Sequence, residues 1–147
     1  MAAFQKFNQF IEDVYNGEHN LSTDVLKIAL TNAANPPVSG NTVLTDLTTV
    51  SLANASTDTI TTVSSTQTNG TYSLILDDLT VSASGGSIGP FQYVVIYNSA
   101  NSKLIGYASY GLELTVADTQ SFVVDFNVSL FTAIWKQLLT QIKLQVK

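Results

Sequence analysis

The stretch TITTVSSTQTNGTYSLIL, residues 59–76, decides the fold class of this chain. At its centre stands Asn69-Gly70, a pair that tolerates positive φ at both middle positions of a tight β-turn. β-Branched and aromatic residues, which are typical of strands, lie on both sides of the pair. The stretch therefore predicts a β-hairpin that joins residues 59–67 to residues 71–76.

The strand pattern continues on both sides of this hairpin. Residues 91–97 form an almost unbroken apolar run, which predicts a central strand buried on both faces. Residues 26–30 alternate as a half-buried strand does. Turn residues separate further strand-like segments, at residues 48–52, 79–84, 103–110, 113–114 and 121–127. About eight short strands predict a mainly β fold, an antiparallel β-sandwich or barrel.

One amphipathic helix is predicted at the N-terminus, over about residues 3–16. Phe4, Phe7, Phe10 and Ile11 recur at spacings that place them on one apolar stripe. Gly17 stands where a C-terminal cap is expected. Such a stripe needs a large apolar partner, either the chain's own β-rich body or a neighbouring subunit. These four residues are therefore candidate interface residues.

The C-terminus fits two interpretations. Its apolar residues follow a helical stripe, but they also fit a last strand that ends at about Trp135 and an amphipathic extension over residues 136–147. We favour the second interpretation, in which the extension is a contact element. The candidate interface residues of this region are Phe131, Trp135, Leu138, Leu139 and Ile142.

The composition indicates a single domain with a surface that is poor in charge. The chain has 147 residues, of which 45% are hydrophobic and only 12% are charged, against about 25% charged residues in a typical soluble domain. Ser, Thr and Asn stand in place of the missing charges. Such a surface costs little to desolvate when a partner covers it, although an ordinary β-protein surface explains the composition equally well.

Charge and hydropathy argue against two classes of partner. The net charge is −5, and all six basic residues are lysines. Nucleic-acid binding needs a basic patch, so we expect none. No run of about 18 apolar residues could span a membrane, and the first eleven residues lack the apolar core of a secretory signal. We expect the chain to be made in a cytoplasm.

No pattern in the sequence predicts a catalytic residue, a metal site or a cofactor. The chain has no cysteine and one histidine, His19, which we expect in a loop where it caps backbone groups. A hydrolytic triad would need a nucleophile and an orienting carboxylate beside it. Asp77-Asp78 is expected to be a turn, and the glycine-rich residues 85–90 run into a strand instead of the helix that a phosphate loop requires.

Several stretches, taken together, resemble a known family. They are KFNQFIED at residues 6–13, DVLKIALTN at 24–32, SGGSIGPFQYVVIYN at 84–98, LIGY at 104–107 and FVVDFN at 122–127. This ordered set, which covers about residues 4–127, resembles a family of small tailed-bacteriophage proteins that recur among virion structural genes. Relatives usually end soon after the last of these stretches, whereas this chain continues to Lys147.

The resemblance implies a structural role in the virion and no enzymatic activity. The leading hypothesis is a capsid decoration, or cement, protein that lies on the capsid surface and binds the major capsid protein. It would act as a homo-oligomer such as a trimer, because many modest contacts repeated by symmetry stabilise a shell. The alternatives are a tail, baseplate or fibre-associated protein, and a receptor- or carbohydrate-binding module. The last would require several of Tyr72, Tyr93, Tyr97, Tyr107 and Tyr110 to line one exposed sheet.

Overall fold

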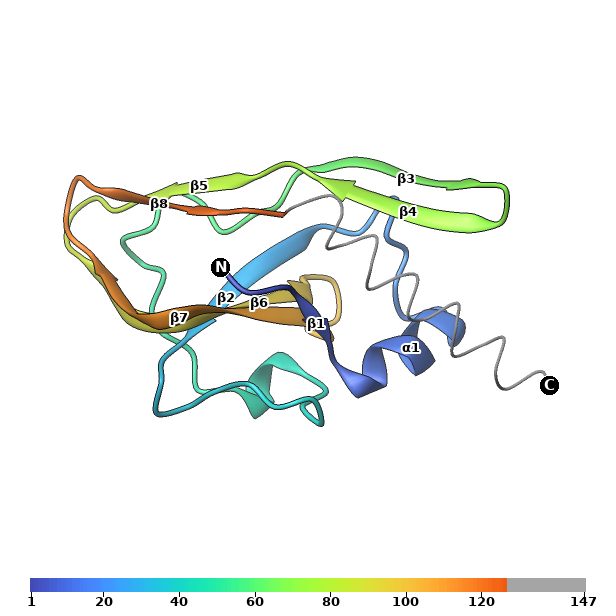
Figure 1. The fold of residues 1–147 in the computed structure, drawn as a ribbon, viewed down its shortest axis with the longest axis horizontal. Coiled ribbons are helices and arrows are strands. Elements are labelled where there is room, and N and C mark those ends of the chain that lie inside the picture. Colours follow the sequence, from blue (N-terminus) through green and yellow to red (C-terminus); the bar gives the residue numbers. More distant parts are fainter. Residues whose placement is uncertain (127–147) are drawn as a thin grey trace.

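The computed structural model describes residues 1–126, which form a mainly β fold (Figure 1). Within these 126 residues, one α-helix, α1 (Asn8–Tyr15), and one 3₁₀ helix, η1 (Leu44–Asp46), accompany the strands. The eight strands are β1 (Gln5–Lys6), β2 (Leu26–Thr31), β3 (Thr62–Thr68), β4 (Thr71–Leu76), β5 (Leu79–Ser82), β6 (Ile88–Asn98), β7 (Leu104–Val116) and β8 (Ser121–Val124).

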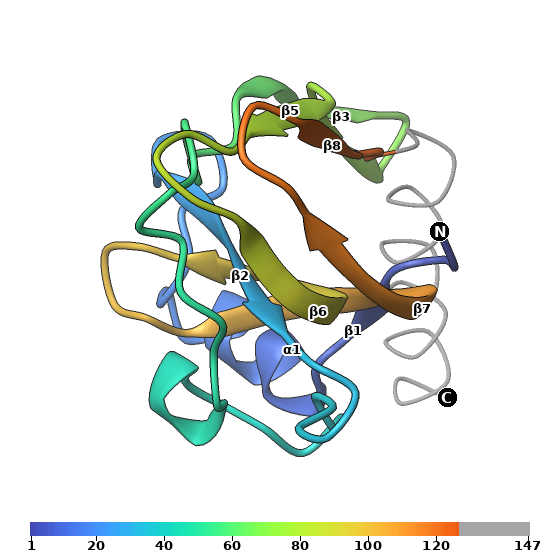
Figure 2. The ribbon, with the colours of Figure 1, turned by 90° about the vertical axis from the view of Figure 1, so that its left-hand side faces the viewer.

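The strands form two layers that enclose the main core. The lower layer is a four-stranded antiparallel sheet in the order β1-β7-β6-β2, and the upper layer consists of the antiparallel pairs β3–β4 and β5–β8 (Figures 1 and 2). None of these three sheets closes into a barrel. The prediction of an antiparallel, sandwich-like β fold with one helix near the N-terminus is therefore confirmed.

Strand β6 lies between β7 and β2, and both of its faces are buried. Val94 and Ile96 point into the main core between the layers, whereas Val95 belongs to a second apolar cluster on the other face of the sheet. All three side chains are fully buried. This confirms the prediction from the apolar run at residues 91–97, because alternate side chains of a strand point to opposite faces.

The second face of the central sheet is covered by the segment that contains η1. Leu44 and Leu47 pack there against the cluster of Phe7, Ala29, Val95 and Leu104. The strand predicted at residues 48–52 is wrong, because this segment touches β2 at a single point, the bridge between Val50 and Leu30. A turn from Leu52 to Ala55 follows at once and ends the pairing.

The helix begins at Asn8 and not at about residue 3 as predicted. Gln5 and Lys6 instead form β1, which pairs with Tyr107 and Gly106 of β7. A Cβ atom at Gly106 would lie only 2.9 Å from the carbonyl oxygen of Gln5. The missing side chain of Gly106 thus allows β1 to approach β7, and this pairing keeps the chain extended up to Phe7, where ψ is 149°.

The predicted hairpin is present, and its turn has the expected backbone. Asn69 and Gly70 adopt φ values of 52° and 78°, and they connect the paired residues Thr68 and Thr71. The segments predicted at residues 103–110 and 113–114 form one long strand, β7, which passes through Gly111 at a φ of 85°. Strand β8 ends at Val124, earlier than predicted.

Candidate functional site

The three predicted interface phenylalanines of the N-terminal segment lie inside the chain's own core. Phe4, Phe7 and Phe10 are 5%, 0% and 0% exposed. The Phe4 ring stacks on Phe126 with 5.6 Å between centroids, and Phe7 packs on Tyr107 at 4.8 Å. The prediction that these residues anchor a partner is corrected, because their side chains pack inside the core of this chain.

The other candidate interface residues divide into two groups. Ile11 is partly buried and packs against the main core, so at most one edge of its side chain is open to a partner. The remaining five lie outside the described residues, and their assignment stays a prediction; they are Phe131, Trp135, Leu138, Leu139 and Ile142.

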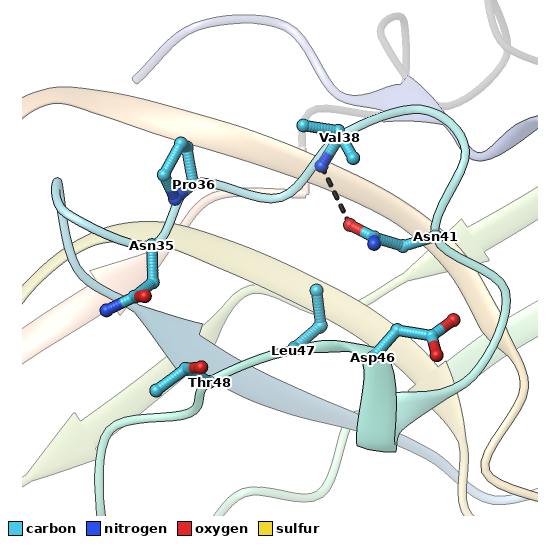
Figure 3. Close-up of a pocket in the computed structure, with 7 residues that line it drawn as sticks. All are labelled: Asn35, Pro36, Val38, Asn41, Asp46, Leu47 and Thr48. Atoms are coloured by element: carbon cyan, nitrogen blue, oxygen red, sulfur yellow. Dashed lines mark hydrogen bonds between the residues drawn. The ribbon is translucent and has the colours of Figure 1, made fainter.

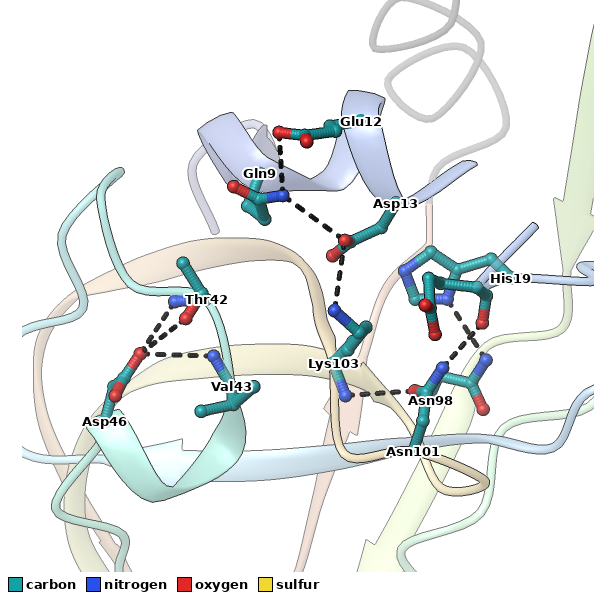
Figure 4. A network of polar contacts seen from close by, with 11 residues as sticks. Gln9, Glu12, Asp13, His19, Thr42, Val43, Asp46, Asn98, Asn101 and Lys103 are labelled. Atoms are coloured by element: carbon teal, nitrogen blue, oxygen red, sulfur yellow. Dashed lines mark hydrogen bonds and ion pairs between the residues drawn. The ribbon is translucent and has the colours of Figure 1, made fainter. Parts of the chain in front are cut away.

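A polar cluster joins α1 to the turn between β6 and β7 (Figure 4). Asn98 is the last residue of β6, and its side-chain nitrogen Nδ2 donates hydrogen bonds to Asp24 Oδ2 at 2.6 Å and to His19 Nδ1 at 3.1 Å. Lys103 Nζ forms an ion pair with Asp13 Oδ1 of α1 at 3.1 Å. Both Asp13 and His19 are buried, at 2% and 8% exposure. The cluster therefore brings together two regions that are far apart in the sequence, residues 13–24 and residues 98–103.

His19 lies in a loop as predicted, but its hydrogen-bond partner is a side chain and not the backbone. The oxygen of the Asn98 amide accepts from Ala100 N at 2.9 Å, which fixes the amide so that its nitrogen faces the ring. The neutral ring thus accepts at Nδ1 and carries its proton on Nε2. Nε2 is buried and has no hydrogen-bond partner among residues 1–126, and Phe10 packs on the ring at 5.3 Å.

This geometry differs from that of a catalytic triad. In a triad the imidazole must hydrogen-bond a nucleophile through one nitrogen and a carboxylate through the other. Within residues 1–126, no hydroxyl group hydrogen-bonds to either ring nitrogen of His19. The cluster instead fixes the position of the β6–β7 turn against α1.

His19 should make the protein less stable in mild acid. Burial lowers the pKa of His19 from its usual 6.5, and Lys103 acts in the same direction, although Asp13, Asp24 and Glu18 oppose them. Protonation would also set an N–H at Nδ1 against the Asn98 amino group. Because the unfolded chain binds this proton more readily, the stabilisation is complete above pH 6.5 and is lost as the pH falls below it.

We expect the free energy of unfolding to fall between pH 7 and pH 5, by at most about 1.4 kcal/mol per pH unit for one proton. His19→Gln, whose amide oxygen can accept from Asn98, should flatten this slope. Urea unfolding followed by circular dichroism at several pH values measures it. An equal slope in both proteins would show that His19 does not titrate on folding.

A pocket lies beside η1, and two of its lining residues, Asn41 and Asp46, accept hydrogen bonds from the backbone of the surrounding loops (Figure 3). The carboxylate of Asp46 accepts hydrogen bonds from the backbone of Thr42 and Val43, which lowers the pKa of Asp46. Asn41 Oδ1 accepts from the backbone of Val38. Asp46 is the one charged residue in the described lining, and its hydrogen bonds from Thr42 and Val43 all end on Oδ2. No group of three or more metal-ligating side chains occurs in the part of the chain that the structure describes.

The five tyrosines do not share one face, but Tyr93, Tyr97 and Tyr107 lie half-buried on the same face of the central sheet. Tyr97 and Tyr107 pack against the second cluster, whereas Tyr72 and Tyr110 pack against the main core. Tyr110 donates a hydrogen bond to the carbonyl of Val123 at 2.8 Å, and burial raises the pKa of Tyr110 to about 12. The carbohydrate-binding module therefore stays an alternative prediction.

The four strands of the upper layer contain no charged residue, and exposed Asp77, Asp78 and Asp125 flank them. We call these four strands, β3, β4, β5 and β8, the uncharged layer. Their inward side chains, such as Leu74, Val81 and Phe122, are buried. The exposed side chains are those of Val63, Thr66, Gln67, Thr68, Thr80, Ser121 and Val123. The sequence shows that the chain has few charged residues. Only the sheet topology shows that the strands without charged residues lie together in one layer.

Comparisons with protein-family models, with curated proteins and with solved structures found no match for this chain. Among residues 1–126, no helix is both long enough and apolar enough to cross a membrane. Function is therefore inferred from the residues and surfaces themselves.

Proposed function

We propose that this chain is a capsid decoration protein of a tailed bacteriophage, and that it binds coat subunits through the outer face of the uncharged layer. The observation that carries the proposal is the absence of charge from all four strands of that layer. The resemblance of residues 4–127 to virion structural proteins supports the same class of function.

The distribution of charge favours this face over the rest of the body. Residues 1–126 contain all eleven Asp and Glu residues but only Lys6, Lys27 and Lys103, so their net charge is 3 − 11 = −8. A partner that covers a carboxylate must desolvate it or supply a cation. A partner that covers Thr and Ser hydroxyls needs only to replace their bonds to water, so the uncharged layer is the least costly surface to bury.

Repetition makes modest contacts sufficient for this role. A shell offers the same binding position many times, and an oligomeric ligand can engage several positions at once. Each further contact is then intramolecular, and the combined affinity exceeds that of any one contact. The C-terminal segment with Trp135 and its apolar neighbours remains a predicted second contact element.

Copy number in purified virions tests the proposal. Quantitative mass spectrometry should find the chain in hundreds of copies per particle, in a ratio to the major capsid protein set by the shell's symmetry. Tens of copies or fewer would indicate a tail, baseplate or fibre-associated protein instead. Absence from the particle would overturn a virion role altogether.

A charge placed on the uncharged layer tests the surface. Thr80 of β5 is exposed and lies opposite the exposed Val123 of β8, so Thr80→Lys adds a charge at the middle of this pair's outer face. We expect this variant to bind particles that lack the protein at least tenfold more weakly. Thr49→Lys is the matched control. Thr49 is also an exposed threonine, but it lies in the segment that covers the other face of the central sheet. Equal binding by both variants would rule out this face.

A further inference from the structure

Strand β3 has a free edge. Within residues 1–126 its only strand partner is β4, and no other backbone hydrogen bond reaches Thr62–Thr68. The hairpin that β3 forms with β4 reaches beyond the end of the central sheet (Figure 1). A row of peptide groups along β3 is therefore open to another strand.

The free edge lacks the features that usually prevent strand pairing. Exposed edges are normally protected by lysine, proline, inward-pointing charges or a covering loop. The whole hairpin, residues 62–76, has neither a charged residue nor a proline, and a single irregularity in the register occurs at its base, between Thr62 and Ser64. The rest of β3, from Ser64 to Thr68, is a regular edge.

The register identifies which peptide groups point outward. Thr68 and Thr71 close a two-residue turn, so they form the first hydrogen-bonded pair of the hairpin. Hydrogen-bonded and non-hydrogen-bonded pairs alternate along an antiparallel ladder. The N–H and C=O groups of Gln67 and Ser65 therefore point away from β4, towards the free edge.

We propose that this edge pairs with the same edge of a second copy of the chain, and that the two β3 strands run antiparallel about a twofold axis near Ser65. Two chains that each carry a net charge of −5, with all eleven carboxylates within residues 1–126, repel one another over most of the surface of these residues. The hairpin is the long projecting element without a carboxylate, and the nearest charges in the sequence are Asp58 and Asp77. Asp58 is already paired with Lys27.

A second copy also matches the edge in length and in chemistry. In the proposed register Ser65 exchanges both of its outward hydrogen bonds with Ser65 of the second copy, and Val63 lies opposite Gln67. No like charges meet across the pair. The paired hairpins would join two uncharged layers into one larger face. The pairing goes beyond the proposed function and does not depend on it.

Charge substitution at Thr66 tests the pairing. Its side chain is exposed on β3, and in this register it lies diagonally across from Thr66 of the second copy, within reach of a long side chain. Sedimentation velocity of the full chain should give twice the chain mass of 15.8 kDa at high concentration. Thr66→Lys and Thr66→Glu should each weaken dimerisation at least tenfold, and a mixture of the two should restore dimers.

The mixture separates loss of pairing from loss of folding, because a misfolded variant is not rescued by its opposite. Thr49→Lys serves again as the control and should dimerise like the unchanged protein. The chain has no cysteine, so a nitroxide on Thr66→Cys reports the distance between the two copies directly, and the spectrum should broaden by close spin–spin contact.

Three outcomes would overturn the pairing: an unchanged protein that stays monomeric, a trimer, or a dimer that both Thr66 variants form as well as the unchanged protein does. None of them alters the copy number in virions. A failure of this proposal is therefore distinguishable from a failure of the proposed function.

Discussion

Replacing Phe7 with alanine should lower the free energy of unfolding by roughly 3–5 kcal/mol, the usual cost of removing a fully buried aromatic side chain. Phe7 is 0% exposed and packs with Ala29, Val95 and Leu104 on the lower face of the central sheet. It also joins β1 to α1, so little backbone around it can move to close the cavity. Urea unfolding followed by circular dichroism measures the loss.

Leu112→Ala is the matched control for this truncation. Leu112 is 59% exposed on β7, and its replacement should cost under about 1 kcal/mol. A Phe7→Ala protein that unfolds like the unchanged chain but no longer binds its partner would restore Phe7 to the interface. That result would contradict its burial in the described core.

Lys103→Met should destabilise the fold by about 2–3 kcal/mol, because it leaves the carboxylate of Asp13 buried without its cation. The side chain of Asp13 is 3% exposed, and its Oδ2 atom has no hydrogen-bond partner in the described residues. Lys103 itself is 26% exposed, so some water can replace it, and the loss is smaller than for a fully buried pair.

A double-mutant cycle separates the ion pair from the packing of the lysine stem. Asp13→Asn in the Lys103→Met background removes the unpaired charge and should recover at least half of the lost stability. Lys27→Met is the matched control, since the Lys27–Asp58 pair is about one-third exposed on both sides and should be worth under about 1 kcal/mol. Equal losses from both lysine substitutions would show that burial of Asp13 is not decisive.

The features that the sequence predicted correctly depend only on residues that are adjacent in the sequence. The turn at Asn69-Gly70 follows from the backbone freedom of two adjacent residues, and the buried strand at residues 91–97 follows from one continuous apolar run. The start of α1 depends instead on Gly106, about a hundred residues away, which admits β1 to the sheet. A local apolar stripe carries no information about that contact.

The polar cluster could not be predicted for the same reason. Asp13, His19 and Asn98 are brought together only when the β6–β7 turn folds against α1. The composition did predict a surface poor in charge, but the four uncharged strands are spread from Thr62 to Val124 in the chain. The pairing of β5 with β8 places them in one layer, and no pattern within a single segment encodes that pairing.

The placement of β6 between two apolar clusters has a consequence for how the protein opens. Amide protons along this strand are covered by β7 on one side and β2 on the other, so they should exchange with solvent only when the whole domain unfolds. The β3–β4 hairpin, a two-stranded ribbon, should exchange much sooner through local opening. We therefore expect a rigid interior beside a hairpin that opens without unfolding the rest of the domain.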